Sequence, residues 1–98
     1  MTLLDLFDSW IKFFINELPL SKRILFDLGL IKYKLVYDGF HGILGQGGGG
    51  LIKLYIAPIL DHPKNHDEKS LKKLVKDIFL HELNHNFGLH DSPHPYPF

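Results

Sequence analysis

The residues best suited to catalysis or metal binding lie near the C-terminus. There, His81 to Asp91 contain the motif HExxH, extended to HExxHxxGxxD. On a helix, residues four apart share a face, so His81 and His85 can offer two imidazole nitrogens to one metal ion. Glu82 lies about 100° further round the helix, beside the ion rather than on it. A carboxylate in that position suits a general base acting on metal-activated water. The pattern therefore predicts a hydrolase that uses a metal, with zinc as the expected ion.

The third metal ligand has three candidates. Gly88 is the residue type that lets a helix end in a left-handed turn, so the chain can double back and bring Asp91 to the metal. His90 competes because imidazole is a common zinc ligand, and His94 is a third candidate from the C-terminal tail. Known layouts of this kind of motif usually place the third ligand three residues after the glycine, and this likeness ranks Asp91 first, His90 second and His94 third. We therefore expect Asp91→Ala to weaken zinc binding more than His90→Ala.

The segment that leads into the motif has the period of a core-packed helix. Its apolar residues recur at helical spacing, and four lysines fill the other face: Leu71, Leu74, Val75, Ile78, Phe79 and Leu83 against Lys69, Lys72, Lys73 and Lys76. This pattern predicts a helix that presents His81, Glu82 and His85 from a packed position.

Two helical segments are expected to precede the sheet. The first covers Leu3 to Leu18, with Thr2 as its cap and Pro19 at its end. Its broad apolar stripe favours a core position over a dimer contact. The second is a short turn from Ser21 to Leu28, which Gly29 ends.

The predicted sheet is small and mostly antiparallel. Apolar and polar residues alternate from Ile31 to Asp38, which indicates a strand with one solvated face. The run Gly45 to Gly50 lacks the phosphate-loop patterns, so we expect a flexible loop that borders the cleft. A second strand is expected over Leu51 to Leu60, with Pro58 limiting its end to an edge position. The expected fold class is α+β, with an N-terminal helix, this mixed or antiparallel sheet, and the motif-bearing helix packed across it.

The composition narrows the function further. The 98 residues are expected to form a single domain, 1–98, with 45% hydrophobic residues for a modest core. Eleven basic residues balance eleven acidic ones, so no overall field favours nucleic acid or an anionic membrane. Cysteine is absent, and the apolar N-terminal run carries charges and has no cleavage pattern. We therefore expect a cytoplasmic protein.

The extended motif resembles the metzincin layout, and more closely the small bacterial minimal zincin family of zinc metallopeptidases. The resemblance spans roughly residues 30 to 91 and includes Tyr37-Asp38-Gly39 and the stretch from Leu54 to Leu60. It implies a reduced zincin with a zinc cleft, whose edge strand, at residues 51–57, aligns an extended peptide substrate. The chain departs from these families in its proline-rich tail, Ser92 to Phe98, and in lacking a methionine turn, since Met1 is the only methionine.

The leading functional hypothesis is peptide-bond hydrolysis by zinc-activated water, with Glu82 as general base and His81, His85 and Asp91 as metal ligands. A second hypothesis is a zinc-binding domain without significant catalysis that acts as an interaction module. A third is a metal-dependent ribonuclease similar to YbeY, whose HxxxHxxGxxH layout resembles this one. Glu82 stands where that family tends to have glycine, and the neutral net charge gives little help in holding RNA.

Overall fold

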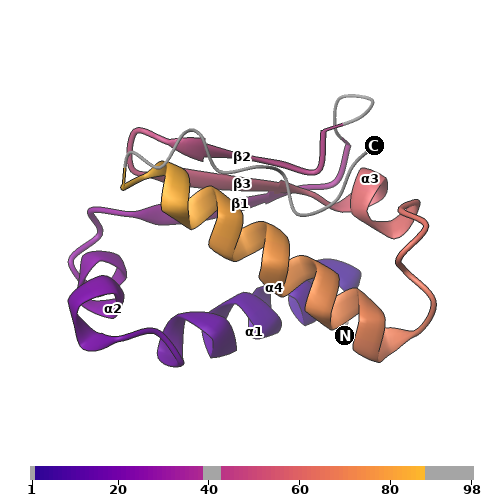
Figure 1. Cartoon of the computed structure of the whole chain (residues 1–98), viewed down its shortest axis with the longest axis horizontal. Helices are drawn as coiled ribbons and strands as arrows, with labels where there is room; N and C mark the ends of the chain where they lie inside the picture. Colours follow the sequence, from indigo (N-terminus) through magenta and orange to yellow (C-terminus); the bar gives the residue numbers. More distant parts are fainter. Residues whose placement is uncertain (1, 39–42, 88–98) are drawn as a thin grey trace.

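The computed structural model describes residues 2–38 and 43–87, which form two layers (Figure 1). A three-stranded sheet forms one layer, and the long helices α1 and α4 lie side by side beneath it. The elements follow in the order α1 (Leu3–Asn16), α2 (Leu20–Asp27), β1 (Lys32–Val36), β2 (Gly45–Gly48), β3 (Leu51–Tyr55), α3 (Ile56–Leu60) and α4 (Glu68–His85). The predicted α+β class is confirmed.

Helix α1 begins at a complete capping box. The Thr2 hydroxyl accepts a hydrogen bond from the Asp5 amide at 3.1 Å, and the Asp5 carboxylate accepts one from the Thr2 amide at 3.2 Å. The helix ends at Asn16, two residues before the predicted end. Its inner face carries the buried side chains of Phe7, Trp10, Ile11, Phe14 and Ile15. This face packs in the common core, as predicted.

The sheet is mixed, and the glycine-rich segment is part of it. Strand order is β1-β3-β2, with β1 and β3 parallel and β2 and β3 antiparallel. The expectation of a flexible loop over Gly45 to Gly50 was wrong, because Gly45–Gly48 pairs with β3 in regular register. Gly49 and Gly50 form a two-residue turn with φ of 62° and 80°. Positive φ at both central residues is what a tight hairpin of this kind requires.

Strand β3 is shorter than predicted, and it is central. The predicted strand Leu51 to Leu60 ends at Tyr55, and Ile56–Leu60 form the short helix α3. Pro58 is the third residue of α3, where its missing amide hydrogen costs no helical hydrogen bond. Because β1 and β2 pair with β3 on its two sides, residues 51–57 are not the edge strand that the sequence suggested. The edge beside α4 belongs to β2.

Helix α4 begins at a second capping arrangement, in which the Asp67 carboxylate accepts a hydrogen bond from the Ser70 amide at 2.8 Å. Its buried face consists of Leu71, Leu74, Val75, Ile78, Phe79, His81, Glu82 and Leu83. These include every apolar residue that the helical period predicted. Phe79 lies between the helices, with its ring centre 6.5 Å from that of Phe14 and 6.0 Å from that of Phe26. The core therefore holds the site-bearing end of α4 against the sheet.

None of the helices described in this structure is both long and apolar enough to cross a membrane.

Candidate metal centre

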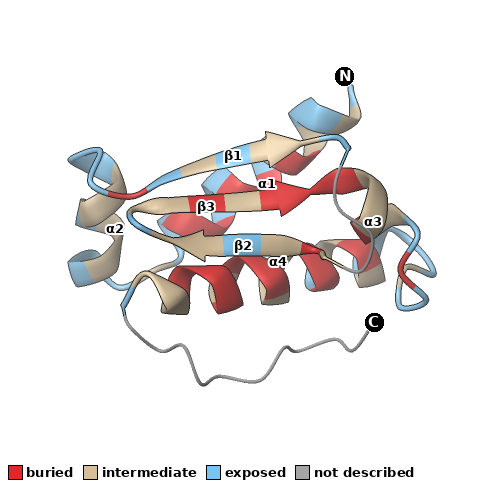
Figure 2. Cartoon of the chain, turned by 90° about the horizontal axis from the view of Figure 1, so that it is seen from above, coloured by how far each residue is buried: buried red, intermediate tan, exposed pale blue. Residues whose placement is uncertain are grey.

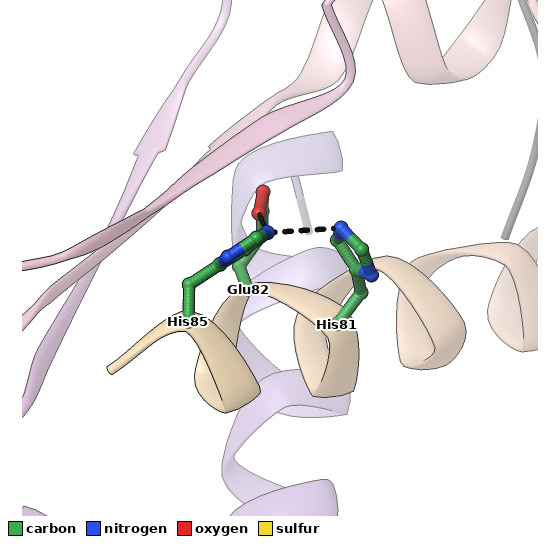
Figure 3. Close-up of side chains that lie close together, drawn as sticks. All are labelled: His81, Glu82 and His85. Atoms are coloured by element: carbon green, nitrogen blue, oxygen red, sulfur yellow. Dashed lines mark hydrogen bonds and ion pairs between the residues drawn. The ribbon is translucent and has the colours of Figure 1, made fainter. Parts of the chain in front are cut away.

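The last two turns of α4 bring three functional side chains together. His81, Glu82 and His85 rise from the same side of the helix (Figure 3). The Nε2 atoms of the two histidines are 3.0 Å apart, and Glu82 Oε1 is 3.5 Å from His85 Nε2. His81 and Glu82 are buried, and His85 is partly exposed. The sequence motif thus becomes a compact cluster of two nitrogen donors and one carboxylate.

The cluster is compatible with a zinc ion. Two imidazole nitrogens bound tetrahedrally at the usual zinc–nitrogen distance would lie about 3.3 Å apart. The observed separation of 3.0 Å is close to that value, and possible ligand atoms of His81, Glu82 and His85 all lie within 4.8 Å of one another. Small rotations of the rings would therefore suffice for both nitrogens to bind one ion. The donor chemistry, imidazole with a carboxylate beside it, is also what zinc prefers.

Burial changes the acidity of Glu82. Only 3% of the residue is exposed, and removal from water disfavours the charged carboxylate. As a result, burial raises the pKa of Glu82 to about 7 in the metal-free protein. A carboxylate with a pKa in this range is well matched to taking up and releasing a proton at neutral pH.

The opposite wall of the site is strand β2, and its closeness depends on glycine. A β-carbon at position 47 would lie 2.2 Å from the backbone oxygen of Glu82, which no real contact allows. A β-carbon at Gly45 would meet the Glu82 side chain at 3.2 Å and Ile78 at 3.1 Å. The strand therefore lies directly on the backbone of the helix at its functional turn. Sequence reasoning placed the glycines at the cleft but missed this contact.

Asn86 fastens the same turn of the helix to the hairpin. Its side-chain oxygen accepts a hydrogen bond from the Gly50 amide at 2.7 Å. Its side-chain nitrogen lies 3.2 Å from the Glu82 carbonyl oxygen and 3.4 Å from that of Leu51. One amide group thus links α4 to the second residue of the β2–β3 turn and to the first residue of β3. Sequence reasoning also missed this residue, because its role comes from contacts between distant segments.

A pocket of about 530 Å³ lies between these two walls. Its lining combines the four residues of β2 with two residues of β3 and two of α4: Gly45, Gln46, Gly47, Gly48, Leu51, Lys53, Glu82 and His85. The pocket gives a ligand access to the carboxylate and to one imidazole. The three candidates for the third metal ligand, Asp91, His90 and His94, lie outside the described residues, as does Gly88.

Comparison with known proteins agrees with this geometry. No curated protein and no solved structure gives a significant match to the chain. A family model described as zincin-like metallopeptidase matches residues 43–93, which is just over half of the chain and includes β2, β3, α4 and the whole extended motif. This family is one of zinc-dependent peptidases and agrees with the resemblance inferred from the motif. The chain belongs to the zincin-like metallopeptidases.

Proposed function

We propose that the protein hydrolyses peptide bonds with a zinc ion held by His81, His85 and Asp91. The observation that carries this proposal is the cluster at the end of α4, where two imidazole nitrogens lie 3.0 Å apart. The Glu82 carboxylate lies beside them and lines the same pocket as His85. Asp91 completes the set by its spacing in the motif.

Glu82 is the proposed general base. When bound, zinc acts as a Lewis acid that polarises the scissile carbonyl and lowers the pKa of the water it carries. Glu82 takes a proton from the attacking water and then delivers it to the leaving amine. In the metal-free protein, burial raises the pKa of Glu82 to about 7, so this side chain can exist both with and without its proton near neutral pH.

The substrate is proposed to bind as an extended peptide along the free edge of β2. In the described part of the sheet, β2 pairs with β3 on one side only, so its other edge retains backbone groups for a further strand. The same strand lines the pocket that contains Glu82 and His85. A peptide added at this edge would therefore pass beside the carboxylate, and this edge takes the place of the edge first expected at residues 51–57.

Zinc content per chain tests the metal site. We expect close to one zinc per wild-type chain by mass spectrometry of the metal, and almost none in His85→Ala. In a zinc titration, Asp91→Ala should weaken binding more than His90→Ala does. The reverse order would show that His90, not Asp91, is the third ligand. If His85→Ala retained its zinc, the proposed zinc site would be wrong.

Turnover of a peptide library tests the chemistry. Glu82→Gln keeps the size of the side chain but removes the base, so zinc should remain bound while cleavage falls by roughly 100-fold or more. Circular dichroism and zinc content of the same preparation serve as controls for folding and metal loading. Cleavage by zinc-loaded Glu82→Gln at the wild-type rate would exclude Glu82 as the base.

A further inference from the structure

The face of the sheet that points away from α1 and α4 carries two adjacent lysines. Figure 2 looks onto this face, with both helices behind the strands. On β3, Ile52 and Leu54 are fully buried toward the helices, so Lys53 between them points to the opposite face. On β1, Lys34 is the register partner of Lys53 and therefore shares that face.

These two lysines lie opposite each other on neighbouring strands. Directly paired residues on neighbouring strands have β-carbons about 5 Å apart, and like charges at such positions are unfavourable. Among residues 2–38 and 43–87, neither Lys34 nor Lys53 forms an ion pair. The repulsion is an energetic cost that an anionic ligand on this face would relieve.

The glycines of β2 leave Lys53 accessible from the edge of the sheet. Between Lys53 and the free edge, β2 presents a single side chain, that of Gln46, which is the register partner of Lys53. The Tyr55 hydroxyl donates a hydrogen bond to Gln46 Oε1 at 2.9 Å, and this bond holds the amide over β3. Lys53 accordingly lines the same pocket as Glu82 and His85.

We propose that Lys53, supported by Lys34, selects peptide substrates that have an acidic residue opposite Gln46. A peptide strand paired with β2 would lie about 10 Å from β3, two strand spacings away. A lysine side chain and a glutamate side chain together span roughly that distance. The proposal rests on the peptidase function proposed above and names the substrate class for the same site.

An acidic peptide fits these observations better than a nucleic acid does. The lysine row ends in the pocket that contains Glu82 and His85, where a peptide bond has to lie for hydrolysis. The two lysines form a short row rather than a long basic track, and the net charge of the chain is zero. Nucleic-acid binding by contrast depends on many phosphate contacts.

Direct binding tests the proposal without requiring turnover. Zinc-loaded Glu82→Gln protein is titrated into three fluorescein-labelled, extended eight-residue peptides that differ at one central position, which is Glu, Gln or Lys. Fluorescence anisotropy should show the Glu peptide binding roughly two- to fivefold more tightly than the Gln peptide, with the Lys peptide weakest. The difference should shrink as salt is raised from 50 mM to 500 mM, an interval that shortens the screening length severalfold.

Charge reversal supplies the matched control. Lys53→Glu in the same background should invert the order, so that the Lys peptide binds best. Lys69→Glu makes the same change in net charge at an exposed position in the first turn of α4, where an acidic residue also favours the helix. That variant should keep the preference for the Glu peptide.

Each contrary outcome has a distinct meaning. Equal binding of the Glu and Gln peptides, no binding of any peptide, or the same loss of preference in Lys53→Glu and Lys69→Glu would overturn the proposal. Tighter, Lys53-dependent binding of a labelled single-stranded oligonucleotide would overturn it in favour of nucleic acid. A Lys53-dependent preference for the Glu peptide in a protein without Glu82-dependent cleavage would keep the recognition site and refute the peptidase function alone.

Discussion

Helix α4 and strand β2 form the two walls of the pocket, and they contribute to it in opposite ways. The helix presents side chains, with Glu82 and His85 lining the cavity and His81 beside them. The strand contributes almost none, since three of its four residues are glycine. The helix therefore supplies the reactive groups, and the strand supplies backbone at close range.

This contrast explains why substitutions should act differently on the two walls. On α4, a substitution such as Glu82→Gln removes a chemical group and leaves the packing largely intact. On β2, a side chain added at Gly45 or Gly47 displaces the wall itself, because both glycines already touch the helix. Added bulk on β2 should therefore affect stability most, and loss of the hydrogen bonds between the walls should affect it least.

Gly47→Ala should have the largest effect on folding. The new methyl group would lie 2.2 Å from the Glu82 backbone oxygen, so the hairpin must move away from the helix. We expect the free energy of unfolding to fall by about 3 kcal/mol, measured by urea denaturation of the metal-free protein. Gly49→Asn is the matched control, since a β-carbon there meets no described atom within 4 Å and asparagine tolerates its φ of 62°. Equal stability of Gly47→Ala and wild type would show that the strand is not held against α4.

Raising the pH should destabilise the metal-free protein through Glu82. Its pKa rises from an ordinary 4.5 to about 7 on folding, so the native state holds the proton more tightly than the unfolded chain. Stability is then favoured below pH 4.5 and is lost as pH rises toward 7, by an amount on the order of 2 kcal/mol. Urea denaturation with a chelator present should show this loss in wild type relative to Glu82→Gln.

In Glu82→Gln, the contribution of position 82 should not change with pH. If wild type and Glu82→Gln follow the same pH dependence, the carboxylate does not titrate in this range. Burial on α4 would then not be what sets the proton affinity of Glu82.

Asn86→Ala should have the smallest of these effects, because it removes hydrogen bonds between the walls without adding bulk. The Gly50 amide and the Glu82 and Leu51 carbonyls lose a partner, which should cost about 1 kcal/mol of unfolding free energy. Thermal or urea unfolding measures it, and amide hydrogen exchange at Gly50 should speed up. Asn84→Ala is the control, because its side chain forms no hydrogen bond with the described part of the chain. If both alanine variants lose the same stability, the bridge has no specific role.

The two walls also differ in how far the sequence alone can predict them. Helix α4 follows from its apolar period and from the Asp67 cap, and the proximity of His81, Glu82 and His85 follows from helix geometry. Strand β2 does not follow from local preference, because glycine is a poor strand former. Its pairing becomes favourable only once β3 lies beside it and α4 packs against its inner face.

Two other features depend on tertiary contacts in the same way. Ile56 to Leu60 has the composition of a strand and forms helix α3 after the sheet ends. Asn86 gains its role from the turn at Gly50, which is 36 residues away in the chain. Local sequence patterns therefore predict helix α4 and its reactive side chains. The position of strand β2 and its link to α4 through Asn86 depend on the assembled fold.

The single side chain of β2 has a consequence for folding fidelity. Strands that are rich in glycine specify their register weakly. A slip by one residue exchanges the two faces of the strand, and without side chains the two faces are nearly the same. Here a slip would turn Gln46 inward, onto the helix backbone, where even a β-carbon at the neighbouring position 47 finds only 2.2 Å of room. Gln46 therefore fixes the register of the hairpin. In a pairing shifted by one residue, its side chain would collide with the helix that carries Glu82.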